Sequence, residues 1–187
     1  MARMEDVFDY KTGGFAAVRD AAREATGAYQ DAARGLDTLK EWVLIEMGMP
    51  NTAGAIHALA HEQPKRFDRL GDILHQRHIM QLYPATAEYT VRPEDLDGVF
   101  EQVIGLLERI EAALRLCVQT ADENGLYALG RAFENLEMEN SASYEKFMYA
   151  WQMYSRNDMS ATSFENWIAR LFDTKGGGGD ADGDESR

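Results

Sequence analysis

The sequence contains one cysteine, Cys117, which excludes an internal disulfide framework and suits a reducing compartment. Basic residues are also few, because 19 lysines and arginines stand against 32 aspartates and glutamates, for a formal net charge of −13. This balance argues against binding to a phosphate backbone, so nucleic acid is not expected as a partner. The same negative field attracts cations.

Long apolar runs are missing as well. None approaches the length needed to span a bilayer, and the N-terminus lacks the apolar segment of a signal peptide. Alternating runs of β-branched residues are scarce, and no phosphate loop, nucleophile elbow or zinc-finger spacing is present. We therefore expect a cytoplasmic helical protein with no membrane association.

What the sequence does have is helical periodicity. Hydrophobic residues make up 45% of the 187 residues and recur with the period of an α-helix. Gly48 with Pro50 ends the first block, Asn51 or Thr52 is expected to cap the second, and Pro93 is expected in the first turn of the third. The four predicted long helices cover 15–47, 51–83, 93–124 and 126–156.

A short fifth helix is predicted near the C-terminus, where Thr162 to Glu165 match a capping box. Such a helix is too short to be stable alone, so it should dock on the bundle or on another subunit. The glycine-rich, acidic stretch after it cannot form a core. The expected organisation is an N-terminal extension (1–14), an all-α antiparallel four-helix bundle with a short fifth helix (15–174), and a flexible tail (175–187).

All four histidines lie within the second predicted helix. At 100° per residue, the basic residues of this helix, Arg66 among them, are expected to face solvent. A mixed stripe follows the border between that face and the core, within an arc of about 60°. Imidazoles and carboxylates one turn apart are what a metal site on a helix requires. The alternative is an ordinary half-exposed flank with local ion pairs. The stripe consists of His57, His61, Asp68, Asp72 and His75.

The stretch IHALAHEQPKRFDRLGDILHQR resembles the second helix of the Dps (DNA-protection-during-starvation) miniferritins, a branch of the ferritin-like superfamily. There, a His is followed by an acidic ligand after four residues, an Asp after eleven more and an acidic residue after another four. His57, His61, Asp72 and Gln76 stand at these positions. The segments YPATAEY and LLERIEAALRLCVQTADENGL are also similar, so the resemblance covers roughly residues 36–151.

Three positions depart from the family pattern. His61 and Gln76 replace carboxylates, and Glu41 stands where the family has a His before a Trp. His61 still provides a ligand atom, and His75 is able to substitute for Gln76. These departures keep a second interpretation open, namely a ferritin-fold protein that has lost its iron chemistry and serves assembly or partner binding.

The resemblance implies a ferritin-like bundle that binds Fe(II) and oxidises it with peroxide or oxygen, for iron storage and oxidative-stress protection. It implies a homo-oligomer built from two-fold dimers, which in the family form a dodecamer. A stripe beside the core face fits sites shared between subunits. The implied catalytic residues are His57, His61 and Asp72, and the implied metal ligands are His57, His61, Asp72, His75, Gln76 and Glu41.

Overall fold

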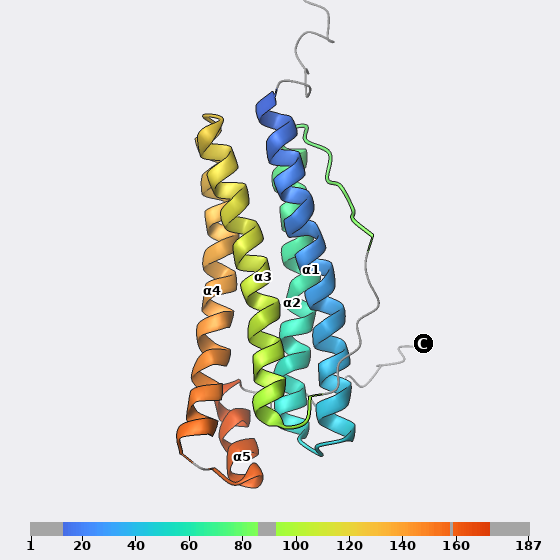
Figure 1. Cartoon of the computed structure of the whole chain (residues 1–187), viewed down its shortest axis with the longest axis vertical. Helices are drawn as coiled ribbons and strands as arrows, with labels where there is room; N and C mark the ends of the chain where they lie inside the picture. Colours follow the sequence, from blue (N-terminus) through green and yellow to red (C-terminus); the bar gives the residue numbers. More distant parts are fainter. Residues whose placement is uncertain (1–12, 86–92, 158, 173–187) are drawn as a thin grey trace, which may run out of the picture.

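The computed structural model describes residues 13–85, 93–157 and 159–172. These residues contain five helices and no strand, which confirms the predicted all-α class (Figure 1). None of these helices is long and apolar enough to cross a membrane. Residues 1–12 of the predicted extension and the predicted tail lie outside the described residues. The helices are α1 (Gly13–Ile45), α2 (Pro50–His75), α3 (Leu96–Glu123), α4 (Tyr127–Arg156) and α5 (Ala161–Leu171).

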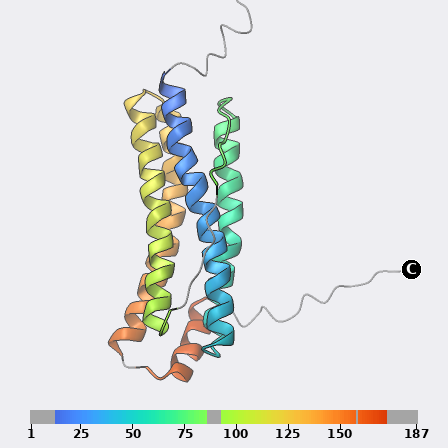
Figure 2. The same cartoon turned by 45° about the vertical axis from the view of Figure 1, so that its right-hand side comes forward.

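The four long helices form two antiparallel hairpins, α1–α2 and α3–α4 (Figures 1 and 2). The hairpins pack together through α1 against α3 and α2 against α4. Because α2 ends at one end of the bundle and α3 begins at the other, the two helices point the same way. α5 lies at the end of the bundle where α1 meets α2, and it contacts α2.

One apolar core runs along the bundle axis and includes side chains from all five helices. Burial of these side chains is the main favourable contribution to folding. The predicted apolar faces of the helices are the buried ones. The largest fully buried side chains are Tyr29, Phe100, Phe133, Phe164, Leu36, Leu39, Ile56, Leu70, Leu74, Leu106, Leu107 and Ile110.

α2 ends at His75, eight residues before the predicted end near Tyr83. The backbone of His78 adopts the left-handed conformation, with φ of 58°. The N–H of Ile79 then donates to the carbonyl of Leu74 over 3.0 Å, a bond typical of a helix C-terminus. Ile79 is buried there, so the chain leaves the helix and returns to the core. The prediction failed because the apolar periodicity continued past this turn.

The connection after α2 packs against α1 and α2. Gln81 is 5% exposed, and its Nε2 donates to Oγ1 of Thr26 over 3.3 Å. A Cβ added at Gly71 would lie 2.5 Å from Oε1 of Gln81, so the absence of a side chain there makes room for this contact. The ring of Tyr83 lies 5.8 Å from that of Phe67. Gly71 therefore leaves room for the buried side chain of Gln81.

α3 begins later than predicted. Asp95 is its N-cap and accepts a hydrogen bond from the N–H of Gly98 over 2.8 Å, so Pro93 precedes the helix. At α2 the predicted caps, Asn51 and Thr52, instead lie inside the first turn, and Pro50 is the first helical residue. Both errors are within the usual uncertainty of helix ends read from sequence.

The predicted capping box of α5 is wrong. Ser160 caps this helix and accepts from the N–H of Ser163 over 3.3 Å. The carboxylate of Glu165 caps a different helix, because it accepts from the backbone N–H groups of Asn51 (2.7 Å) and Thr52 (2.8 Å). A carboxylate at this position stabilises the positive end of the α2 dipole. α5 therefore docks on its own bundle.

Candidate metal centre

Two of the predicted ligands, His57 and His61, lie together on the outer side of α2. They are one helical turn apart, and their Nε2 atoms are 3.1 Å from each other. The rings are nearly perpendicular, with centroids 4.3 Å apart. His61 is exposed, and the side chain of His57 is 45% exposed. The two nitrogens are within hydrogen-bond distance of each other, and imidazoles one turn apart on a helix can reach a common metal ion.

A carboxylate that the sequence interpretation missed belongs to this pair. Oδ1 of Asp37, on α1, lies 3.5 Å from Nδ1 of His57. Nδ1 of His57 has no hydrogen-bond partner at this distance, but the charge of a carboxylate on this side favours a proton on Nδ1, which leaves the lone pair of Nε2 for a metal. The sequence does contain a signal for this contact. Asp37 stands ten residues before Met47 and His57 ten after it, so a tight turn between α1 and α2 brings the two residues to the same level of the hairpin.

The other predicted ligands do not join the histidine pair within one chain. Asp72, His75 and Gln76 are exposed near the end of α2. Eleven residues separate His61 from Asp72, about 16 Å along a helix. Glu41 is exposed on α1 and pairs with Lys40. Across the described part of the chain, no three His, Cys, Asp or Glu side chains come close enough to hold a metal ion.

Comparison with solved structures identifies the architecture, and 124 solved chains match this one. A crystal structure of M. penetrans ferritin superposes with a TM-score of 0.75, over 82% of this chain and 94% of that one, at 11% sequence identity. The fold is that of a ferritin. No family model matches the sequence, and no curated protein matches it.

The interior of this ferritin fold differs from a di-iron carboxylate centre, in which Glu and His ligands project into the bundle. The buried polar residues of the long helices include no acidic side chain. Arg66, predicted to face solvent, is instead 8% exposed and donates to Oγ of Ser143 over 2.8 Å. Its positive charge opposes a cation site in the bundle. The buried polar residues of the long helices are Thr26, Tyr29, Thr52, Gln63, Arg66 and Asn140.

Burial dominates the chemistry of this interior. It raises the pKa of the Tyr29 hydroxyl far above its ordinary value, against the opposing effect of the nearby Arg66 charge. The hydroxyl of Tyr29, Nη1 of Arg66 and Oδ1 of Asn140 are buried without a hydrogen-bond partner. Buried polar atoms of this kind are commonly satisfied by ordered water. The candidate site for metal chemistry is therefore the outer side of α2.

Proposed function

We propose that this protein is a Dps-like miniferritin that binds and oxidises Fe(II) at sites shared between two chains, for iron storage and protection against oxidative stress. The observation that supports this most is the pair of accessible imidazoles, His57 and His61, with Nε2 atoms 3.1 Å apart outside the bundle. On an outer helix face, the remaining ligands of such a site would have to come from a second subunit.

The spacing along α2 supports a two-fold arrangement. His61 and Asp72 are equally far from the midpoint between Arg66 and Phe67, and so are His57 and Gln76. Two α2 helices lying antiparallel about this midpoint would bring the histidine pair of one chain to the Asp72 end of the other. Each dimer would then hold two equivalent sites.

The donor set suits iron as a substrate. Neutral imidazoles with a carboxylate, and positions left open, are typical of Fe(II) sites that react with oxygen or peroxide. In this proposal His57 and His61 bind the ion, Asp37 holds the proton of His57 on Nδ1, and Asp72 of the partner subunit balances its charge. Each Fe(II) gives up one electron, and peroxide or oxygen accepts it. The net charge of −13 favours the approach of cations.

A second candidate is a ferritin-fold assembly or partner-binding protein without iron chemistry. Two observations favour it. Gln76 offers an amide where a carboxylate is expected, and the Glu41 carboxylate is engaged by Lys40. A site with fewer charged ligands holds divalent iron less tightly.

Iron binding and oxidation by the purified chain separate the two candidates. We expect the double variant His57→Ala with His61→Ala to lower the rate of peroxide-driven Fe(II) oxidation by about 10-fold or more, since both imidazole donors are lost. His78→Asn is the control, because His78 lies beyond α2 and outside the proposed ligand set, and asparagine tolerates its left-handed backbone. Oxidation that is equally fast in the double variant and the parent would reject the iron function and favour the assembly role.

A further inference from the structure

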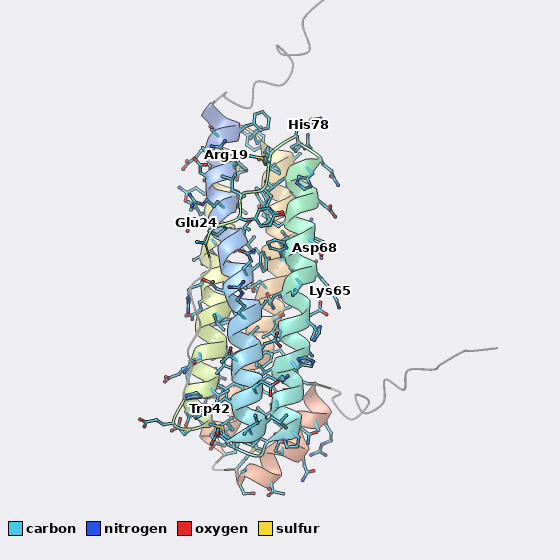
Figure 3. The ribbon with its side chains drawn as sticks, turned by 90° about the vertical axis from the view of Figure 1, so that its right-hand side faces the viewer. Arg19, Glu24, Trp42, Lys65, Asp68 and His78 are labelled. Carbon is cyan, nitrogen blue, oxygen red and sulfur yellow. The ribbon has the colours of Figure 1, made fainter. Side chains whose placement is uncertain are left out.

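The exposed side of α2 carries a continuous polar stripe. Its members recur every three or four residues from His57 to His75, and Gln76 follows directly, which places them along one side of the helix. Lys65 is 67% exposed and Asp68 is exposed. Figure 3 shows both side chains pointing away from the bundle, one above the other along α2. This stripe adds Lys65 and Gln76 to the five residues of the stripe predicted from the sequence, so it consists of His57, His61, Lys65, Asp68, Asp72, His75 and Gln76.

The two oppositely charged residues at the centre of this stripe are related by the same midpoint as the proposed ligands. Lys65 and Asp68 each stand one and a half positions from the midpoint between Arg66 and Phe67. In an antiparallel pair of α2 helices centred there, Lys65 of each copy faces Asp68 of the other. Two ion pairs then lie directly beside the two-fold axis.

We infer that α2 packs antiparallel against α2 of a second copy of this chain, and that Lys65 and Asp68 set the register. This inference rests on the two-fold dimer of the proposed function, and it assigns the two residues that align the ligands. Lys65 already bonds Glu62 of its own chain over 2.8 Å, so it would bridge two carboxylates. Charges across an interface contribute more to its register and specificity than to its affinity.

Registers shifted by one heptad are less favourable. A shift in one direction places Asp68 opposite Asp72 of the partner subunit, and a shift in the other places Lys65 opposite the partner's His61. The first opposes two carboxylates, and the second opposes a lysine to a histidine instead of a carboxylate. Like charges facing each other are destabilising.

Apolar side chains lie where such a dimer needs them. Leu44 and Ile45 are 43% and 70% exposed at the end of α1, beside the start of α2. Met80 and Tyr83 are 65% and 62% exposed just beyond the other end of α2. An antiparallel pairing brings Leu44 and Ile45 of one chain toward Met80 and Tyr83 of the partner subunit. Burial of these side chains would supply affinity, while the central charges supply alignment.

Charge reversal tests the register directly. Lys65→Asp and Asp68→Lys each place two like-charged pairs beside the axis, so each is expected to raise the dimer dissociation constant about 10-fold at low salt. The double variant restores both pairs in reversed orientation and is expected to return the constant to that of the parent. Analytical ultracentrifugation in metal-free buffer provides the measurement. Single variants that dimerise like the parent, or a double variant as weak as the singles, would overturn the inference.

Mixing the two single variants gives a second test. In a mixed dimer, both charges of one chain are acidic and both of the other are basic, so each of the two pairs is attractive. We expect native mass spectrometry to find mixed dimers well in excess of both homodimers. A statistical mixture would contradict the register. The double variant of the first test also distinguishes a register displaced by one turn. In that register Lys65 faces Asp72 of the partner subunit, so the double variant would not recover the dimer dissociation constant of the parent.

The control reverses charges elsewhere. Arg109 and Glu101 are exposed on α3, which does not border the stripe, so Arg109→Asp with Glu101→Lys should leave dimerisation unchanged. The outcome is independent of iron, since dimerisation is measured without metal. If charge reversal has no effect but His57 remains necessary for iron oxidation, the register inference fails and the proposed function stands. If the double variant recovers dimerisation but the parent oxidises no iron, the proposed function fails and the register inference stands.

Discussion

At the scale of single residues, Cys117 is the simplest case to test. Its side chain is fully buried, and burial raises the pKa of the thiol to about 12. Since the thiolate is the reactive form, we expect iodoacetamide to leave the native protein unlabelled at pH 8 and to label it rapidly in guanidinium chloride. Mass spectrometry measures the added group. Rapid labelling of the native chain would show that α3 opens locally.

The same thiol makes stability depend on pH. The folded state holds its proton up to about pH 12, whereas the unfolded thiol loses it near its ordinary pKa of 9.0. The folded state therefore binds more protons above pH 9, and the free energy of unfolding should fall as pH rises from 9 towards 12. Urea titrations of the parent and of Cys117→Ala test this, with a shallower slope expected in the variant. Equal slopes would exclude Cys117 as the cause.

Asp37 provides a test of how the histidine pair is oriented. Asp37→Asn keeps the shape of the side chain but removes the charge 3.5 Å from Nδ1 of His57. Loss of such a supporting carboxylate typically lowers metal affinity by about 10- to 100-fold. We expect weaker Fe(II) binding by calorimetry with an unchanged urea midpoint, because Asp37 is 59% exposed. Unchanged binding would remove Asp37 from the site.

For single residues, the sequence predicted the position correctly where helical periodicity alone determines which side of a helix the residue occupies. His57 and His61 were expected on one side of a helix, and they lie there. Arg66 was misplaced because its helical angle points outwards, while its long side chain reaches Ser143 on α4. Neither this contact nor that between Asp37 and His57 is visible in a single helical pattern, since each joins two helices.

At the scale of secondary-structure elements, α5 stabilises the start of α2 through Glu165. Glu165→Gln keeps the length of the side chain but removes the charge that faces two backbone N–H groups. Loss of a cap or of a favourable charge at a helix N-terminus costs about 1 kcal/mol. We expect a lower urea midpoint, with Asn166→Ala, exposed on the same helix, as the control. Equal midpoints would show that the cap adds nothing.

Substitutions at two glycines allow the effect of helix propensity on stability to be distinguished from the effect of packing. Gly105 in α3 has no atom within 4 Å of an added Cβ, so Gly105→Ala should stabilise the protein by about 0.5–1 kcal/mol. Gly71→Ala brings the same propensity but a Cβ 2.5 Å from Oε1 of Gln81, so the buried amide of Gln81 must shift and the variant should be less stable than Gly105→Ala. Urea unfolding of both variants provides the comparison. Equal gains would show that Gln81 moves without cost.

The five helices were predictable as elements, but several of their ends were not. Periodicity identifies a helix because one face must be buried, and that requirement is local. The end of α2 depends instead on the left-handed backbone of His78 and on the burial of Ile79. The role of Glu165 depends on Asn51, which is distant in the sequence. Contacts between distant segments overrode the local signals in both cases.

At the scale of the whole molecule, the proposed site requires more than one chain. We expect size-exclusion chromatography with light scattering to give a mass that is an even multiple of 21.0 kDa, up to twelve copies, since each proposed site needs two subunits. His57→Ala with His61→Ala should assemble like the parent, because the proposed interface takes its register from Lys65 and Asp68 and its affinity from apolar side chains at the two ends of α2. A monomer at micromolar concentration would contradict the shared site.

The link between α5 and α2 has a consequence for the order in which the chain acquires its structure. The two groups that meet at this cap are 114 residues apart, and Glu165 belongs to the last helix. During translation, the first turn of α2 lacks this carboxylate until Glu165 has been synthesised and α5 has docked. The imidazoles of His57 and His61 are therefore synthesised long before the side chain that caps their helix.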